Sequence, residues 1–324
     1  MISLAALFVG LVVVPTTIWI ALAVHCHVRR PWLRWFVSCV PLTIVGASLG
    51  VLPLMPWALT IWLALLVITI TWWFSLRPRS DGDWAQGMEV LPRAEIAGDM
   101  LHVRNYRNFS YSASGEAVPR YEERTYDLAK LLSIDYFLAH WSGPTMAHTL
   151  VSFGFDDGQF LCVSVEARRQ RWQSYSPLWG LFRSYQLFFV LGDERDIVRL
   201  RTNIRHEQVY MYRVRLAPQQ LRRLILDYVT RIETLAAQPG WYNSVASNCT
   251  TNLFYHNRVP VPWWLKPNIF LNGLSARAMY RLGFLDNSLS YRELQARCAI
   301  RERALAAGDA ADFSQQIRTQ IVIP

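Results

Sequence analysis

The chain has 324 residues, of which 52% are hydrophobic and only 18% are charged, and its mean hydropathy is +0.13. These values exclude a disordered chain and are unusual for a wholly soluble protein, so part of the chain is expected to meet lipid. All 24 acidic residues and 30 of the 33 basic residues follow position 76. The five cysteines lack any C-x-x-C spacing, which excludes a disulfide framework or a cysteine zinc site.

Residues 1–76 form the expected membrane region. The segment 3–24 is an uncharged run of 22 residues, about the length that a helix needs to cross roughly 30 Å of hydrocarbon. The uncharged segment 35–76 is 42 residues long and has two prolines near its middle. It predicts a helical hairpin at about 35–52 and 57–76, and therefore three transmembrane helices in all.

Two other interpretations of the first segment are weaker. The sequence 22–26 suggests a lipoprotein cleavage site before Cys26, but His25 occupies the position where a small residue is required. His25 and His27 flank Cys26 at a spacing that could touch a metal, although a polar helix end at the lipid headgroups explains them more simply.

The arginines near the predicted spans bear on orientation. With three spans, Arg29, Arg30 and Arg34 lie on the same side of the membrane as Arg77 and Arg79. The positive-inside rule would place the following domain in the cytoplasm.

A short linker, 77–83, leads to a domain predicted at 84–288 and a helical C-terminal tail at 289–324. Apolar residues recur with helical spacing over 217–238, which begins near Pro218 and ends before Pro239. Strands are predicted where apolar residues alternate, at 100–106, 133–138, 148–155, 159–167, 185–191 and 208–214. The strands and helices do not alternate regularly, which indicates an α+β fold.

Several functions have no support in this domain. Its 30 basic and 24 acidic residues give a net charge of only +6, without a basic tract, so nucleic-acid binding is not favoured. The chain has no phosphate loop and no GxGxxG, HExxH or GxSxG motif. We therefore expect neither a cofactor nor a bound metal.

Cys249 is the candidate nucleophile. It follows Ser247 and Asn248, both good N-cap residues, which places it in the first turn of a predicted helix. Unpaired backbone N–H groups and the positive end of the helix dipole stabilise a thiolate there, and can also bind an oxyanion. The alternative, a small buried hydrophobic residue, is favoured for the other cysteines of the domain and its preceding region, Cys39, Cys162 and Cys298.

His148 and Glu166 are the candidate base and orienting carboxylate. A three-residue hairpin turn at 156–158 would pair positions whose numbers sum to 314, so His148 would face Glu166. A carboxylate there can hold the imidazole in one tautomer and stabilise its cation. A two-residue turn would set His148 against Ala167 instead, and a structural pairing without chemistry is the other alternative.

These residues belong to a wider set of stretches that resembles a known family. The stretches are Val103–Phe109, Ala147–Thr149, Ser164–Arg168, Asp193–Asp196 with Arg199 and Arg201, Tyr242–Asn243 and Asn248–Thr251. Between about Asp83 and Arg318 the chain is similar to the family of the Lnb N-terminal periplasmic domain, a bacterial membrane-associated group.

The resemblance implies a fold, an activity and a site. The family resembles permuted papain-like (NlpC-type) thiol enzymes, in which the histidine strand precedes the nucleophile helix. Its named member is similar in activity to an apolipoprotein N-acyltransferase, which passes an acyl chain from phospholipid through the enzyme thiol to a lipoprotein N-terminus. It implies catalytic Cys249, His148 and Glu166. The neighbouring positions expected to support them are Tyr242, Asn243, Asn248 and Thr250.

The family also implies a location. We expect a multi-pass protein of the bacterial inner membrane whose large domain is periplasmic, against the arginine distribution, because that distribution rests on five side chains and an uncharged N-terminus. The family name implies a domain placed before its membrane part, whereas here the apolar segments come first. This departure leaves the acyl acceptor open.

Three functions are therefore compared. The first is a membrane-anchored thiol acyltransferase or lipase that uses phospholipid as acyl donor, with a lipoprotein as a possible acceptor. The loop 259–265 could then enter lipid, or could pack on the core. The second is a papain-like peptidase or amidase acting on a peptide or cell-wall substrate. The third is a non-catalytic scaffold that uses the charges of 193–196, which are better explained by internal ion pairs or a helix cap.

Overall fold

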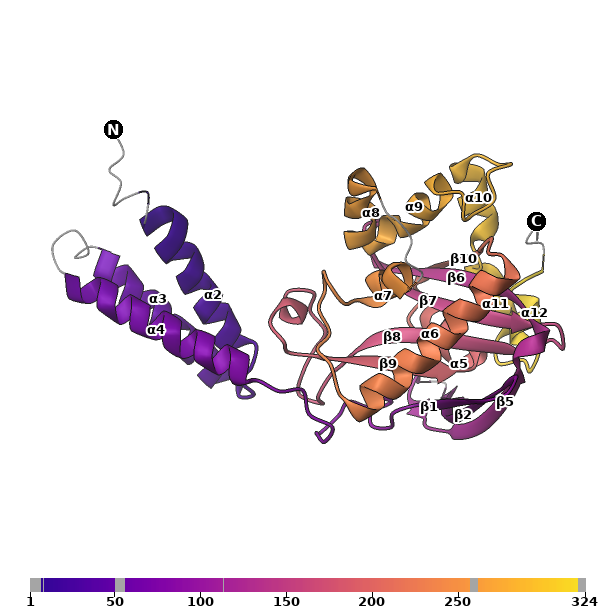
Figure 1. Ribbon diagram of the computed structural model, residues 1–324, viewed down its shortest axis with the longest axis horizontal. Helices are drawn as coiled ribbons and strands as arrows, with labels where there is room; N and C mark the ends of the chain where they lie inside the picture. The colour runs from indigo at the N-terminus through magenta and orange to yellow at the C-terminus, as the bar shows by residue number, and fades with distance from the viewer. Residues whose placement is uncertain (1–6, 8, 50–55, 113, 257–261, 320–324) are drawn as a thin grey trace. The chain divides into compact units, whose positions relative to one another are not determined.

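The computed structural model describes residues 7, 9–49, 56–112, 114–256 and 262–319 (Figure 1). The chain divides into two compact units. The first contains Met1–Ala85 and Arg169–Gln186, and the second contains Gln86–Arg168 and Leu187–Pro324. Helices and strands occur together in the second unit, which confirms the predicted α+β class.

The first unit is mainly helical. A short π-helix precedes three α-helices, and their bounds are η1 (Val9–Val13), α2 (Val14–His25), α3 (Pro31–Leu49) and α4 (Pro56–Ser75). Val13, Val45 and Trp62 are buried against one another within this unit.

The predicted membrane spans are not confirmed. Within the described parts of the chain, no helix combines the length and the hydropathy that crossing a membrane requires. Residues 3–6, 8 and 50–55 of the three predicted spans lie outside the described residues. The spans at 3–24, 35–52 and 57–76 therefore stay a prediction.

One cysteine of this unit differs from expectation. Cys39 is exposed, not buried. The buried positions of α3 are Ser38, Pro41 and Val45, which recur at helical spacing along one face, and Cys39 falls outside that face. Cys162 and Cys298 are buried, as expected.

The first unit also includes 169–186, a grouping that the sequence did not predict. Gln170 forms an isolated bridge with Trp84, and the Gln186 side chain donates to the Arg79 carbonyl at 2.6 Å. The Arg34 guanidinium lies over the Trp179 ring, 4.7 Å from its centroid. These contacts join the segment to residues far earlier in the chain.

The second unit is built on an eight-stranded sheet with the order β1-β2-β9-β8-β7-β6-β10, in which β5 also pairs with β2. The strands are β1 (Arg93–Ala97), β2 (Met100–Arg107), β5 (Tyr121–Asp127), β6 (Leu131–Ser142), β7 (Met146–Phe155), β8 (Phe160–Arg168), β9 (Gln186–Gly192) and β10 (Gln208–Arg213). Two short strands, β3 (Ser110–Tyr111) and β4 (Ala117–Val118), pair separately.

All six predicted strands are confirmed, whereas β1, β5 and the two-residue strands β3 and β4 were not predicted. In the main sheet, β1 (RAEIA) has only five residues, and β5 (YEERTYD) is mostly polar. Only Ala94 of β1 and Tyr126 of β5 are buried. β1 is too short, and β5 too polar, to show the sustained apolar alternation that identifies a half-buried strand.

Helices cover both faces of the sheet. The predicted helix at 217–238 is α6 (Pro218–Ala237), which lies across one face in Figure 1, and its Tyr228 ring packs against Phe153 and Phe189. Apolar residues of α5 (Glu194–Arg199), α11 (Arg301–Ala307) and α12 (Phe313–Gln316) join the core cluster that contains Phe137, Leu150 and Phe188. The predicted C-terminal tail thus contributes to the core of this unit.

Three short helical elements precede α6, namely η2 (Leu128–Lys130), η3 (Trp179–Leu181) and η4 (Leu200–Ile204). Other helical elements follow α6. They are α7 (Cys249–His256), η5 (Trp263–Leu265), α8 (Lys266–Phe270), η6 (Asn272–Leu274), α9 (Ser275–Arg281) and α10 (Tyr291–Cys298). The helix predicted to begin near Asn248 is therefore confirmed as α7.

A buried ion-pair network ties the C-terminal segment to the sheet. The Arg318 guanidinium lies 2.8 Å from the Asp135 carboxylate of β6 and 2.6 Å from the Glu194 carboxylate of α5. The side chains of Asp135 and Glu194 are 1% and 0% exposed. Both carboxylates lose hydration on folding, so their ionised forms need the paired cation for stabilisation.

Arg318→Ala should destabilise the second unit strongly, because it leaves two buried carboxylates short of a partner. The expected loss is about 3–5 kcal/mol of unfolding free energy. Arg93→Ala, which removes a partly exposed arginine paired with Glu233, should cost less than about 1 kcal/mol. Urea unfolding monitored by circular dichroism measures both, and equal losses would contradict the assigned role of Arg318.

Candidate active site

The β7–β8 hairpin has the predicted register. Leu150 pairs with Ser164 and Gly154 with Phe160, so partner numbers sum to 314. The turn contains three residues, since the Phe155 N–H donates to the Gln159 carbonyl at 3.0 Å and Gly158 has a φ of 81°. This conformation favours glycine. The prediction is confirmed, and the alternative that opposed His148 to Ala167 is excluded.

His148 and Glu166 are brought together, with Ser164 between them. His148 Nε2 lies 3.1 Å from Glu166 Oε1 and 2.7 Å from Ser164 Oγ. The Ser164 hydroxyl donates to Glu166 at 2.8 Å, so its single proton is committed to the carboxylate. Nε2 must then be the donor to Ser164, which leaves Nδ1 as the nitrogen available for proton transfer.

Arg201 fixes the carboxylate from another side. Its Nη2 donates to Glu166 Oε1 at 3.1 Å, and its Nη1 lies 3.4 Å from the buried Glu207. Burial would raise the pKa of the Glu166 carboxyl, but the charges of His148 and Arg201 outweigh burial and hold that pKa well below its usual value. Glu166 is therefore ionised at neutral pH.

The ionised Glu166 controls His148. Burial alone would lower the pKa of the imidazole, but the Glu166 carboxylate outweighs both burial and the nearby Arg201 charge and raises the pKa of His148 to about 9. The imidazole is consequently a cation near neutral pH when the adjacent thiol is ionised.

Cys249 is the first residue of α7, as predicted from the cap. The Asn248 side-chain oxygen accepts hydrogen bonds from the backbone N–H groups of Thr250 and Thr251, at 2.9 and 2.8 Å. The Asn248 N–H in turn donates to the Thr251 hydroxyl at 2.9 Å. This reciprocal cap fixes the first turn of α7, which begins at the thiol-bearing residue.

The thiol is poised for ionisation. Cys249 is only 5% exposed, and burial would raise the pKa of its thiol. A hydrogen bond from His148 and the charge of that imidazole outweigh burial, with a further contribution from Thr149, and lower the pKa of Cys249 to about 6. A thiolate–imidazolium pair is thus favoured between about pH 6 and pH 9.

Most of the expected supporting residues act on the helix start, whereas Thr250 also reaches the reacting atom, since its Oγ1 lies 4.0 Å from Cys249 Sγ. The Asn243 side chain accepts hydrogen bonds from the N–H groups of Val245 and Ala246, both at 2.9 Å, and so shapes the turn before α7. Thr250 Oγ1 lies 3.3 Å from Thr149 Oγ1 of β7. Tyr242 is buried.

Ser164 and Arg201 were not assigned to the site from the sequence. Ser164 precedes Glu166 by two residues, and alternation along a strand places such residues on one face, so this contact could have been inferred. Arg201 belongs to the stretches that carry the family resemblance, but no local pattern relates it to a residue 35 positions earlier.

The gap beside the thiol is closely packed and has no room for a water molecule. Its apolar lining comes from neighbouring strands, and two tyrosines and a threonine complete it. The residues around it are Tyr136, Thr149, Leu150, Val151, Val163, Val165, Tyr228 and Cys249. The reacting sulfur therefore faces a mainly apolar surface.

The comparisons with known proteins agree with the resemblance found in the sequence. Residues 117–274 match the family described as the Lnb N-terminal periplasmic domain. This segment is just under half of the 324 residues, and it contains His148, Glu166 and Cys249. The resemblance is therefore confirmed for this segment. No curated protein and no solved structure matches the chain significantly.

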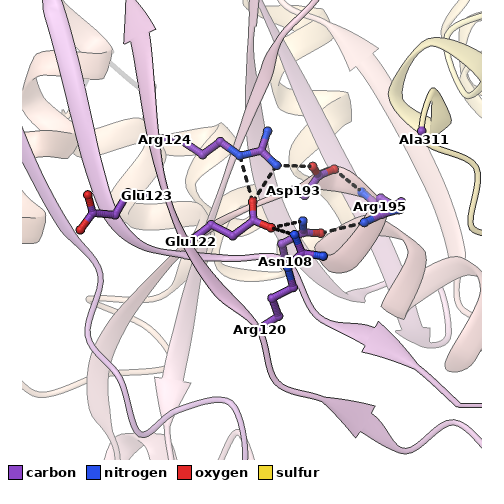
Figure 2. A pocket seen from close by; sticks show the side chains of 8 residues that line it. All are labelled: Asn108, Arg120, Glu122, Glu123, Arg124, Asp193, Arg195 and Ala311. Carbon is purple, nitrogen blue, oxygen red and sulfur yellow. Dashed lines mark hydrogen bonds and ion pairs between the residues drawn. The ribbon is translucent and has the colours of Figure 1, made fainter.

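A second pocket, of about 590 Å³, is polar and has no nucleophile (Figure 2). Arg124 pairs with Glu122 at 2.9 Å and lies 3.8 Å from Asp193, while the Asn108 amide donates to Glu122 at 3.0 Å. Figure 2 shows these side chains directed toward one another, so most of the charges that line the pocket are internally paired. It is a structural network.

The charges of 193–196 are also internal. Asp193 caps α5 by accepting from the Arg195 N–H, and Asp196 is fully buried against Arg107 at 2.8 Å. The prediction of ion pairs and a helix cap is confirmed. In the described part of the chain, no group of three His, Cys, Asp or Glu residues could hold a metal ion.

The pH dependence of thiol alkylation should report the Cys249–His148 pair. In the unaltered protein the rate should rise with pH through an inflection near 6, because the thiolate is the reactive form. His148→Ala removes the charge and hydrogen bond, so the thiol pKa should reach at least its ordinary value of 9.0. At pH 7 the rate should fall about 100-fold.

Iodoacetamide labelling followed by peptide mass spectrometry measures Cys249 alone. His140→Ala removes another partly buried histidine, from β6, and should leave the inflection near 6. An unchanged inflection in His148→Ala would show that another group lowers the thiol pKa.

Glu166→Gln should slow turnover of an ester substrate by roughly 10²–10⁴-fold while preserving the fold. The loss of the carboxylate leaves Arg201 beside the imidazole, so the pKa of His148 should fall from about 9 and the alkaline limb of the pH–rate profile should move down. Ser164→Ala keeps the charge and should have a smaller effect.

The double variant Glu166→Gln/His148→Ala distinguishes orientation from an independent role. It should be no slower than His148→Ala alone, because Glu166 acts through the imidazole. Glu233→Gln, in a partly exposed pair with Arg93, is the matched control. Losses that multiply in the double variant would mean that Glu166 acts elsewhere.

Proposed function

We propose that the chain is a cysteine-dependent acyltransferase or lipase with a permuted papain-like catalytic domain. The observation that carries the proposal is the buried thiol of Cys249 beside an imidazole that is held by Glu166. A lowered thiol pKa, a base within hydrogen-bonding reach and a third group that orients the base together are typical of covalent thiol catalysis.

In the proposed reaction, the Cys249 thiolate attacks the carbonyl carbon of an acyl ester. The C–S bond forms and the carbonyl electron pair moves to oxygen. Collapse of this intermediate breaks the bond to the alcohol oxygen, which takes the proton from His148 and leaves. His148 then accepts a proton from the incoming acceptor, which attacks the thioester and releases Cys249.

Phospholipid is the proposed acyl donor. Four large apolar side chains near the site are exposed, namely Trp263 at 80%, Trp264 at 51%, Phe270 at 41% and Leu271 at 43%. Their exposure does not favour the alternative in which this loop packs on the core, although Leu265 is fully buried. Val259–Val261 of the predicted lipid-facing loop lie outside the described residues. Exposed tryptophans beside a mainly apolar site support a substrate presented by a lipid surface.

The proposed location is the bacterial inner membrane, with the apolar N-terminal segments as a multi-pass anchor and the catalytic domain in the periplasm. The family description supports the periplasmic side, and the uncharged segments before position 76 support an anchor. A lipoprotein N-terminal amine is the proposed acceptor, by similarity to the family.

A peptidase or amidase is the alternative that keeps the same three residues. The side chains packed around Cys249 are mainly apolar, which favours an acyl substrate over a polar peptide. A non-catalytic scaffold is less favoured, because Glu194 and Asp196 are completely buried and cannot reach a partner.

Intact-protein mass spectrometry after incubation with phospholipid vesicles should detect an acyl adduct that hydroxylamine removes, because thioesters are labile to it. Cys249→Ala should carry no adduct and lose acyl transfer by more than about 10³-fold. Cys39→Ala removes an exposed thiol and should leave the adduct unchanged. Cleavage of a peptide amide without any phospholipid-derived adduct would favour the peptidase alternative.

A further inference from the structure

The side chain of Asn272 is directed at the thiol from a segment that the sequence did not relate to the site. Asn272 Nδ2 lies 3.7 Å from Cys249 Sγ and donates to it. Asn272 Oδ1 accepts from the Ala147 N–H at 3.3 Å. Because a backbone N–H can only donate, Oδ1 must face Ala147, and the amide nitrogen is the atom that faces the sulfur.

The backbone around Asn272 is built to hold this position. The Gly273 N–H donates to the Thr145 carbonyl at 3.0 Å, and a Cβ on Gly273 would lie only 2.4 Å from the Pro144 carbonyl oxygen. Only glycine allows η6 to approach the β6–β7 turn so closely. On the other side, the Ser275 hydroxyl donates to the Asn272 carbonyl and contacts the buried Tyr136 hydroxyl at 2.6 Å.

The Asn272 amide is therefore held beside Cys249 Sγ, the nucleophilic atom. When the acyl carbon bonds to Sγ, the carbonyl oxygen lies two bonds from the sulfur. Negative charge develops on this oxygen during the attack. The first backbone N–H groups of a helix have no partner within the helix, so the N–H of Cys249 itself supplies a second donor next to the sulfur. Two donors beside the nucleophile form the arrangement that stabilises a tetrahedral oxyanion.

We propose that Asn272 is a catalytic residue, whose Nδ2 donates to the oxyanion formed on an acyl ester or thioester. This inference rests on the proposed thiol acyl transfer and adds a group to it. In the acylation step, the carbonyl electron pair moves to the oxygen as the C–S bond forms, and Asn272 and the Cys249 N–H bind that oxygen. The pair returns when the alcohol leaves, and both hydrogen bonds weaken again.

Two reactions of the same thiol test this role. Acylation by a p-nitrophenyl ester passes through an oxyanion, whereas alkylation by iodoacetamide does not. Asn272→Ala should slow acylation by roughly 10²–10³-fold. At a pH where the thiol is fully ionised, it should leave the alkylation rate unchanged. Asn272→Asp retains the volume and the oxygen that accepts from Ala147, but replaces the donor with a negative charge, so acylation should fall at least as far. Asn272→Gln keeps an amide donor and should recover part of the rate.

Asn108→Ala is the matched control, since it removes another buried side-chain amide from the polar pocket of Figure 2. Both of its rates should equal those of the unaltered protein. Equal losses of acylation and alkylation in the Asn272 variants would assign Asn272 to positioning Cys249 and overturn the proposal. So would acylation that survives in Asn272→Asp.

Reactions of the unaltered protein distinguish a failure of this inference from a failure of the proposed function on which it rests. If it reacts with neither reagent through Cys249, the proposed thiol chemistry fails and the role of Asn272 fails with it. If it is acylated normally, and the Asn272 variants are acylated equally fast, only the role of Asn272 is wrong.

Discussion

The negative charge of Glu166 is the constraint on which the candidate site depends. Burial alone would leave His148 neutral and Cys249 protonated, because both charged forms lose hydration in the interior. The Glu166 carboxylate raises the pKa of His148 and so favours the imidazolium. The imidazolium in turn lowers the pKa of the Cys249 thiol. The difference between a thiol pKa of 9.0 and one of about 6 corresponds to about 4 kcal/mol in favour of the thiolate. A single anion, held by Arg201 and Ser164, therefore sets the protonation state of a sulfur that it does not touch.

The fold delivers this arrangement by combining three kinds of local structure. A tight hairpin fixes the register that brings His148 to Glu166, a capped helix start presents Cys249, and a glycine-dependent close approach of η6 brings Asn272 to the sulfur. Each element limits the freedom of one side chain before substrate binds. Such preorganisation matters because hydrogen-bond donors that are already aligned need not reorganise when charge develops in the transition state.

The parts of the site that the sequence predicted are those set by short-range rules. A three-residue turn with glycine at 158 determines the register of its hairpin, and a Ser-Asn pair before Cys249 marks a helix start. Asn272 could not be found in this way, because its position depends on how η6 packs against a turn more than a hundred residues earlier. The same reason applies to segment 169–186, whose partners lie near positions 34, 79 and 84. Strands β1 and β5 were missed since their pairing with β2, not their own periodicity, defines them.

The charges around the site also explain why Glu207 is buried there. Arg201 is needed to fix Glu166, yet its cation opposes protonation of His148. Glu207 lies 3.4 Å from Arg201 and 4.0 Å from Arg205, so it compensates the cation that Glu166 does not fully balance. With these two acids and two arginines the cluster is neutral, whether the Cys249 proton is on sulfur or on His148. Acyl transfer through the thiol keeps this balance. The thiolate charge passes to the oxyanion during attack, and it is removed when the imidazolium gives its proton to the leaving alcohol. The site can therefore pass from the thiolate–imidazolium pair to the thioester without a net charge in a buried region. Burying an uncompensated charge would cost free energy.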